Sequence, residues 1–304
     1  MIYQPPLSRY AMSSQISRWL SCPRPRPSEG SRRRPASGRL KAAAVAAGLW
    51  LLHLGVQAAD ITVSAAASLT HALRDVAPLF EAAHPAHKLR FNFGASGGLL
   101  AQMARGAPVD VFISADQETM DQAQAQGLVR AAQRRNVASN TLVVVVPAAG
   151  DSSSKPSNPS KPLAVPQPPS PPKTLDDLAR PAFARIAVGL PASVPAGRYT
   201  QAVLEAAGLW AAIAPKMIGA HHVRQALDYV ARAEVDAGFV YATDAALMPG
   251  KVKVAFTVPT AKSILYPAAP LAAAPRAAEG MKFVDFLFTP AAQDVLAKHG
   301  FGRP

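Results

Sequence analysis

The sequence of 304 residues contains a single cysteine, Cys22. One cysteine cannot form an intrachain disulfide, so a small fold held together by disulfide bonds is excluded. Cys22 also precedes the apolar run at residues 42–56, which argues against a lipoprotein anchor, whose cysteine would follow such a run. If the chain is cleaved after that run, the remaining protein has neither a cysteine nucleophile nor a thiolate ligand for a metal.

Long hydrophobic runs are also lacking. The longest, AAAVAAGLWLLHLGV at 42–56, has 15 residues, whereas a membrane-spanning helix needs about 20. A basic stretch that ends at Lys41 precedes this run, and Val56 and Ala58 occupy the small-residue positions of a signal-peptidase site. We therefore predict that residues 1–58 are a basic leader with a cleaved signal peptide and that the protein acts in the periplasm. A signal anchor that stays attached is the alternative.

Acidic residues are few: 19 Asp and Glu stand against 32 Lys and Arg, which gives a formal net charge of +13. Such a charge is typical of nucleic-acid-binding proteins, but it is spread unevenly along the chain. Nine of the 32 basic residues and one of the 19 acidic residues lie within 1–59, so residues 60–304 keep a net charge of only +5. The basicity therefore belongs mainly to the leader, and we expect no nucleic-acid partner.

Segments with the patterns of strands and helices alternate from Asp60 onward. Apolar, β-prone runs predict strands at 61–66, 89–93, 109–115, 142–147, 184–190 and 237–242. Helical spacing predicts helices from Leu69 and at 99–105, 117–126, 174–179, 197–207, 222–232, 277–288 and 291–298. This alternation predicts an α/β fold with parallel βαβ units, whose ligands bind at the carboxyl ends of the strands. The proline-rich stretch 148–172 interrupts the pattern and is predicted to be a solvated surface loop.

Small and polar residues recur where a predicted helix begins. Ser68 follows the first strand, Ser96 lies in the turn GASGG, Ala196 opens a helix after Pro195, and Val223 opens another. Backbone N–H groups at the start of a helix have no partner within the helix and carry a partial positive charge. Taken singly, each serine is most simply an N-cap. Together, several helix starts that converge on one crevice would form an anion site without Lys or Arg.

Two other kinds of site have partial support in the sequence. Residues 94–98 match G-x-S-x-G, the nucleophile elbow of serine hydrolases, which would make Ser96 a nucleophile. No HGGG-type oxyanion motif precedes Ser96, however, and the histidines that follow are poorly placed, so we expect no enzyme activity. No metal site is expected either. The histidines at 84 and 87 lie in a proline-containing loop, and the adjacent histidines at 221 and 222 cannot both face one metal ion.

Six segments, in this order, resemble the periplasmic molybdate-binding proteins of bacterial ABC importers: ITVSAAASLTHAL, FGASGGLLAQM, GAPVDVFISADQETMD, VPAGRYTQAVL, HHVRQAL and GFVYATDA. The resemblance extends from about residue 60 to 304, apart from the proline-rich stretch. It implies a type II periplasmic binding-protein fold, in which two α/β lobes enclose a ligand cleft. By that analogy, lobe one would comprise 60–139 and 265–304, and lobe two would comprise 140–264 with the insert 148–172.

The resemblance also implies a ligand set and a function. The family's oxyanion ligands correspond to Ser68, Ser96, Ala196, Val223 and Tyr241. One departure is that Ser96 stands alone between Ala95 and Gly97, where some relatives carry a run of serines. The implied function is binding of molybdate, with tungstate as a second ligand, and delivery to a membrane permease by a monomer without a cofactor. A binder of another tetrahedral oxyanion, such as sulfate, is the alternative within the same fold.

Overall fold

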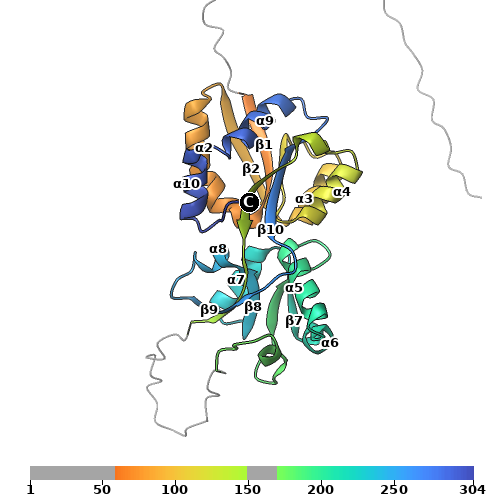
Figure 1. Ribbon diagram of the computed structural model, residues 1–304, viewed down its shortest axis with the longest axis vertical. Helices are drawn as coiled ribbons and strands as arrows, with labels where there is room; N and C mark the ends of the chain where they lie inside the picture. The colour runs from red at the N-terminus through yellow and green to blue at the C-terminus, as the bar shows by residue number, and fades with distance from the viewer. Residues whose placement is uncertain (1–58, 149–169) are drawn as a thin grey trace, which may run out of the picture. The chain divides into compact units, whose positions relative to one another are not determined.

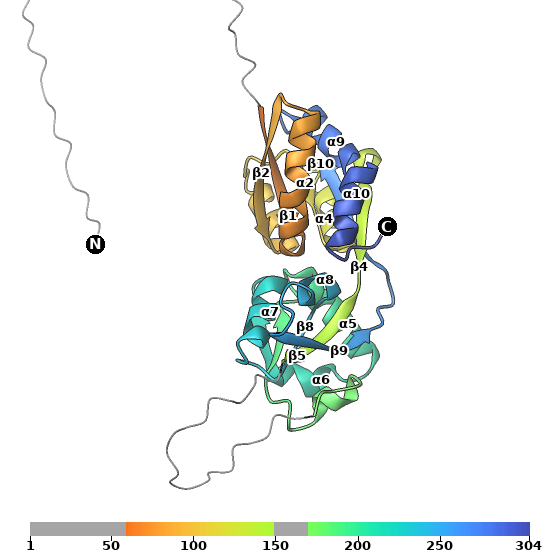
Figure 2. The ribbon, with the colours of Figure 1, turned by 90° about the vertical axis from the view of Figure 1, so that its left-hand side faces the viewer.

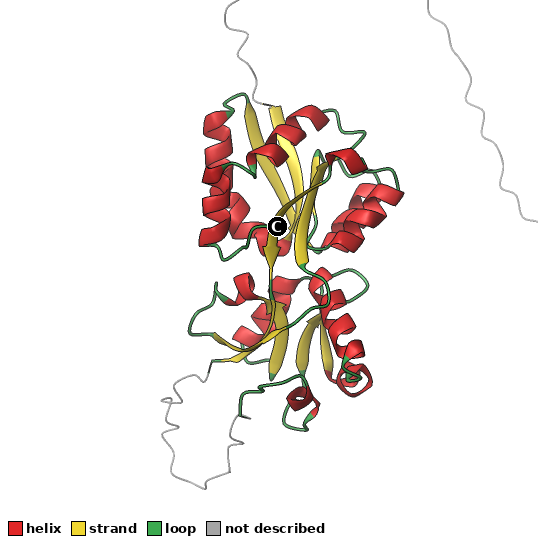
Figure 3. Ribbon diagram, viewed as in Figure 1, coloured by secondary structure: helices red, strands yellow, loops and turns green. Residues whose placement is uncertain are grey.

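The computed structural model describes residues 59–148 and 170–304. The predicted leader and signal peptide at 1–58 lie outside the described residues, as does most of the proline-rich stretch at 148–172. The remainder contains two five-stranded sheets, each flanked by helices on both sides (Figure 3).

The first sheet has the strand order β2-β1-β3-β10-β4 (Figure 1). Its strands are β1 (Ala59–Ala66), β2 (His87–Gly94), β3 (Val111–Ile113), β4 (Arg135–Asn140) and β10 (Ile264–Pro270). Strand β1 pairs in parallel with β2 and β3, whereas β10 runs antiparallel to β3 and β4. The helices of this part are α2 (Thr70–Ala83), α3 (Ser96–Ala104), α4 (Gln117–Ala125), α9 (Ala277–Phe286) and α10 (Pro290–Lys298). Helices α2 and α10 pack side by side although they come from opposite ends of the described chain (Figure 2).

The second sheet has the order β7-β6-β8-β5-β9. Its strands are β5 (Leu142–Pro147), β6 (Ile186–Gly189), β7 (Met217–Ala220), β8 (Ala237–Tyr241) and β9 (Val252–Val258). Strands β7, β6 and β8 are parallel, and β5 lies antiparallel between β8 and β9. The helices are α5 (Pro195–Ala206), α6 (Trp210–Ile213), α7 (Val223–Ala231) and α8 (Ala242–Ala245).

The chain passes between the two sheets twice, once from β4 to β5 at Thr141 and once from β9 to β10 through residues 259–263. We use "lobe one" for the first sheet with its helices and "lobe two" for the second. Two α/β lobes joined by two crossings form the architecture expected from the sequence, so the predicted fold class is confirmed.

Apolar side chains at regular spacing explain why these elements pack. In α2, Leu73, Val76 and Phe80 recur three and four residues apart, and all three are buried. They cover β1, whose Ile61 and Val63 are fully buried. Truncation of a buried aromatic such as Phe80 to alanine costs about 3–5 kcal/mol in proteins generally. Because these apolar side chains are buried in the core, the groups available to form a binding site lie at the ends of the strands and at the starts of the helices.

Several predicted elements need correction. The helix predicted at 99–105 begins three residues earlier, at Ser96, and the one predicted at 174–179 is a short 3-10 helix, Asp176–Ala179. Strands β4, β7, β9 and β10 were not predicted. The sheets are mixed rather than purely parallel, because β10 runs antiparallel to its neighbours in the first sheet and β5 runs antiparallel to its neighbours in the second. Two of the strands that were not predicted give weak local signals: β4 is the polar segment RNVASN, and β10 contains two prolines, with a register shift at Pro267. Strand β9, VKVAFTV, does carry the pattern of a strand, so it could have been predicted.

Candidate functional site

One small cavity lies between residues of the two lobes, and all five residues of the predicted ligand set line it: Ser68, Ser96, Ala196, Val223 and Tyr241. The first two come from lobe one and the other three from lobe two. The rest of the lining is alanine, glycine, valine and proline, together with His222. Among the described residues, no Asp, Glu, Lys or Arg side chain lines this cavity. Its polar character therefore comes from hydroxyl groups and from the backbone.

Three helix starts supply backbone donors to this cavity. Ser96 is the first residue of α3, Val223 is the first residue of α7, and Ala196 is the second residue of α5. N–H groups at these positions have no acceptor within their own helix, and the helix dipole makes each start partly positive. Ser68 lies in the 3-10 turn Ala67–Leu69, which leads directly into α2. The cavity is thus polarised to favour negative charge.

The hydroxyl of Ser96 is fully buried, and its hydrogen-bonding role is fixed by a neighbouring strand end. Its Oγ accepts the backbone N–H of Ala115 at 3.0 Å. A hydroxyl that accepts in this way keeps its own proton for a second partner. The Ser96 side chain is therefore arranged to donate a hydrogen bond.

Gly97 brings lobe two against the start of α3. Its backbone N–H donates to the carbonyl oxygen of Ser193 at 3.0 Å. A Cβ atom on Gly97 would lie 2.8 Å from that oxygen and 2.9 Å from the Ser193 Cα. Only glycine allows this approach of the two lobes, because the contact is to backbone that cannot move aside independently.

Ser68 is held from two directions. Its Oγ lies 3.0 Å from the Tyr266 Oη of β10, and its carbonyl oxygen accepts a guanidinium N–H of Arg224 at 2.9 Å. Arg224 is the second residue of α7 in lobe two, and its Nε lies 2.7 Å from the carboxylate of the fully buried Asp244. Burial raises the pKa of Asp244 to about 6, against the opposing effect of Arg224, so this carboxylate is charged at neutral pH.

Tyr241 ends β8, and only 1% of its surface is exposed. Its hydroxyl has no hydrogen-bond partner among the described residues, although it lines the cavity. Burial raises the pKa of this phenol well above its usual value, so the group stays protonated and can donate. An unsatisfied buried hydroxyl costs about 1–3 kcal/mol. The Tyr241 hydroxyl is therefore a buried donor on a residue that lines the cavity.

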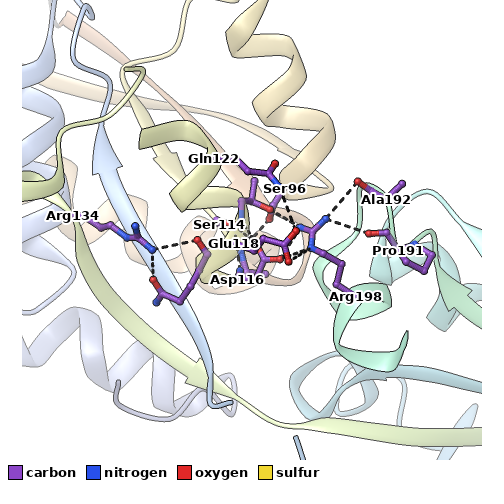
Figure 4. Close-up of polar contacts among 12 residues, drawn as sticks. Ser96, Ser114, Asp116, Glu118, Gln122, Arg134, Pro191, Ala192 and Arg198 are labelled. Atoms are coloured by element: carbon purple, nitrogen blue, oxygen red, sulfur yellow. Dashed lines mark hydrogen bonds and ion pairs between the residues drawn. The ribbon is translucent and has the colours of Figure 1, made fainter. Parts of the chain in front are cut away.

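An ion pair between Arg198 of lobe two and Asp116 of lobe one joins the lobes beside the cavity. The Arg198 Nη2 of α5 lies 2.6 Å from a carboxylate oxygen of Asp116, and the guanidinium also donates to the carbonyl oxygens of Pro191 and Ala192 (Figure 4). Asp116 caps α4 through the N–H of Thr119. Arg198 and Arg224 lie in the segments VPAGRYTQAVL and HHVRQAL, but no local pattern indicates a role for either residue, because their partners are distant in the sequence.

His222 is the N-cap of α7, where its Nδ1 accepts the N–H of Gln225 at 3.1 Å. Burial lowers the pKa of this ring, with smaller contributions in the same direction from His221 and Arg224, so it is neutral at pH 7. A neutral ring whose Nδ1 accepts a hydrogen bond carries its proton on Nε2. His222 thus has no free basic nitrogen with which to activate Ser96.

The larger groove of the protein, of about 660 Å³, has the opposite chemistry. Asp116, Glu118 and Asp121 are among its lining residues. Arg198 and Lys262 line it as well, so its charge is mixed with an excess of carboxylates. The small cavity, with uncharged donors only, is therefore the better candidate for an anion site. Within 59–148 and 170–304, no group of three or more His, Cys, Asp or Glu residues could hold a metal ion.

Comparisons with known proteins agree with this architecture. The family model described as bacterial extracellular solute-binding protein matches residues 61–302. The chain is 36% identical to the molybdate-binding protein ModA of Escherichia coli over 79% of this chain and 88% of that protein. It is 30% identical to the ModA protein of Haemophilus influenzae, over 80% and 90% of the two chains. The periplasmic molybdate-binding protein of Azotobacter vinelandii shares the fold, with a TM-score of 0.64 over 80% and 99% of the chains at 24% identity.

The chain therefore belongs to the family of bacterial extracellular solute-binding proteins, whose two lobes and intervening site the structure displays. Within that family it belongs with the ModA-type periplasmic binding proteins, which confirms the resemblance noted in the sequence. In the part of the chain that the structure describes, no helix has the length and apolar character needed to span a membrane.

Proposed function

We propose that this protein binds molybdate in the cavity between its lobes and delivers it to the membrane permease of an ABC importer. The observation that carries the proposal is the buried hydroxyl of Tyr241, which has no hydrogen-bond partner among the described residues, on a side chain that lines the same cavity as Ser68 and Ser96. The similarity to proteins named for molybdate binding supports the choice of ligand. Tungstate, a tetrahedral dianion of the same kind, is proposed as a second ligand.

The proposed ligand set is neutral. Hydroxyl groups of Ser68, Ser96 and Tyr241 and backbone N–H groups at Ala196 and Val223 would surround the oxyanion. All of these groups can donate, and hydrogen bonds from neutral donors to a charged acceptor are among the stronger ones in proteins. No carboxylate of the described residues lines the cavity to accept a proton from the ligand. A fully ionised oxyanion therefore suits the cavity better than a protonated one such as hydrogen phosphate.

Lobe closure would be part of binding. Contacts that cross between the lobes next to the cavity include the Gly97 N–H to the Ser193 carbonyl, Arg224 to the Ser68 carbonyl, and Arg198 to Asp116. Closure around the anion excludes water, and rotation about the two crossings would open the site again. We propose that the closed form is the one that the permease recognises.

The remaining parts of the proposal concern the setting. The leader at 1–58 is proposed to direct export and to be cleaved, which places the mature protein in the periplasm. The protein is proposed to act as a monomer without a cofactor and without enzyme activity. The hydrogen bond at His222 Nδ1 supports the absence of hydrolase chemistry at Ser96, because the ring offers that serine no base.

Isothermal titration of the purified protein with molybdate, tungstate, sulfate and phosphate tests the proposal. We expect tight 1:1 binding of molybdate and tungstate and much weaker binding of the other two. Ser96→Asp should abolish binding, since it places a negative charge against the anion. Sulfate binding in the absence of molybdate binding would favour the alternative oxyanion. Hydrolysis of p-nitrophenyl esters that is lost in Ser96→Ala would favour an enzyme.

A further inference from the structure

Asn140, the last residue of β4, makes three hydrogen bonds that fix the orientation of its amide group. Its Oδ1 accepts the backbone N–H of Thr141 at 2.8 Å. Since an N–H can only donate, the atom that faces it must be the amide oxygen. The Nδ2 then donates its two hydrogens to hydroxyl groups, to the Tyr266 Oη at 3.0 Å and to the Thr243 Oγ1 at 2.9 Å.

The orientation of Asn140 in turn determines the role of Tyr266. The Tyr266 Oη accepts from Asn140, so its single proton is free for the other neighbour, the Ser68 Oγ at 3.0 Å. Tyr266 is fully buried, and its ring packs edge-on against Tyr241 and Phe301, with centroids 6.1 and 5.4 Å away. Its hydroxyl therefore has little freedom to turn to another partner.

The chain of hydrogen bonds ends in the cavity. Ser68 Oγ accepts from Tyr266, and the proton of Ser68 is left for whatever occupies the cavity that this residue lines. We propose that Asn140 and Tyr266 are positioning residues that fix the Ser68 hydroxyl as a hydrogen-bond donor to the bound anion. This inference rests on the proposed function, since it assumes that the cavity binds an oxyanion.

The same arrangement links the site to the crossing between the lobes. Asn140 directly precedes Thr141, where the chain passes from lobe one to lobe two, and Thr243 belongs to α8 of lobe two. The amide of Asn140 thus contacts both lobes, whereas Tyr266 and Ser68 belong to lobe one. Only the hydrogen bond to Thr243 depends on the arrangement of the lobes, so closure adds one further restraint on the Asn140 amide that positions Tyr266.

Two conservative substitutions interrupt the chain at different points. Tyr266→Phe removes the donor to Ser68 and should weaken molybdate binding roughly fivefold to tenfold, the effect of one hydrogen bond. Asn140→Asp keeps the shape of the side chain, but an ionised carboxylate can only accept. The carboxylate introduced by Asn140→Asp would accept the Tyr266 proton, which would then no longer be donated to Ser68. The Ser68 hydroxyl would instead donate its proton to the Tyr266 oxygen and not to the anion. We expect a larger loss of affinity than in Tyr266→Phe.

The double variant separates this role from a merely structural one. Without the Tyr266 hydroxyl, Asn140→Asp can no longer reverse the direction of the hydrogen bond between Tyr266 and Ser68. The effect of Asn140→Asp on the molybdate dissociation constant should therefore be smaller in the double variant. Tyr229→Phe, on the far half of α7, is the matched control and should bind like the wild type. Melting of the unliganded variants shows that each is folded.

Calorimetric titration with molybdate decides among the outcomes. Loss of affinity in both single variants with strong non-additivity supports the inference. Wild-type affinity in Tyr266→Phe, or full additivity of the two substitutions, would overturn it while the proposed function stands. Absence of oxyanion binding by the wild type would overturn the proposed function and this inference with it.

Discussion

Arg198 and Asp116 join the two lobes immediately beside the buried hydroxyl of Ser96. The Arg198 Nη2 lies 2.6 Å from a carboxylate oxygen of Asp116 (Figure 4). The neighbouring Ala115 donates its N–H to the Ser96 Oγ. Both side chains of the ion pair are largely buried, with 16% and 5% of their surfaces exposed. Two adjacent residues therefore serve both features: Ala115 holds Ser96 of the proposed ligand site, and Asp116 forms the ion pair that joins the lobes.

Arg198→Ala should weaken molybdate binding about tenfold, because a well-formed interlobe pair contributes on the order of 1–2 kcal/mol to closure while Asp116 is resolvated in the open form. The loss should appear mainly as faster dissociation, measured by stopped-flow chase with excess tungstate. Arg232→Ala, an exposed charge on lobe two, is the control. An unchanged dissociation rate in Arg198→Ala would show that the pair does not hold the closed form.

Tyr241→Phe should change stability and affinity in opposite directions. Without ligand, the variant loses a buried hydroxyl that has no partner in the described part of the chain, so its free energy of unfolding should rise by about 1 kcal/mol. With ligand, the missing donor should weaken molybdate binding about tenfold. Urea unfolding and calorimetry measure the two quantities. Equal affinity of the variant and the wild type would remove Tyr241 from the ligand set.

Gly97→Ala should prevent full closure. The added Cβ would lie 2.8 Å from the Ser193 carbonyl oxygen, so we expect at least a tenfold loss of molybdate affinity. The neighbouring Gly98 has no atom within 4 Å of such a Cβ, which makes Gly98→Ala the matched control. Titration of both variants should separate them clearly, and similar affinities would mean that the Gly97–Ser193 contact is not needed for binding.

His222 should make the stability of the unliganded protein depend on pH. Burial lowers the pKa of this ring in the folded state, so below about pH 6.5 the unfolded chain binds more protons at this residue than the folded protein does. The free energy of unfolding should therefore decrease as the pH falls from 7.5 toward 5. His222→Asn keeps an N-cap acceptor without titrating, so its decrease should be smaller.

Urea unfolding of the two proteins at several pH values isolates this contribution, because the other titrating groups, including Asp244, are common to both. Parallel pH profiles for the wild type and His222→Asn would show that the ring does not titrate in this range.

The sequence predicted the features that depend on local pattern. The helix starts near Ser96 and Val223 follow from strand-to-helix transitions, whereas Tyr241 was expected only from the resemblance to the molybdate-binding family. It did not predict the partners that come from long-range pairing. Tyr266 lies in a strand interrupted by prolines and meets Ser68 across 198 residues, and no local periodicity indicates such a contact.

The ion pair between Arg198 and Asp116 shows the same limit. The two residues are 82 positions apart, and their meeting depends on how the lobes approach each other. The mixed sheets were missed for a related reason. Strand β10 returns to the first sheet after the whole of lobe two, so its antiparallel pairing with β3 and β4 reflects topology rather than composition.

The cavity divides its donors between the lobes, with Ser68 and Ser96 on one side and Ala196, Val223 and Tyr241 on the other. Under the proposed function, the donors of one lobe alone could not replace the hydrogen bonds that a dianion loses when it leaves water. Separation of the lobes at the permease would therefore unload the cargo without any proton transfer or chemical step. Separation of the two lobes would by itself convert a site of high affinity for the anion into one of low affinity.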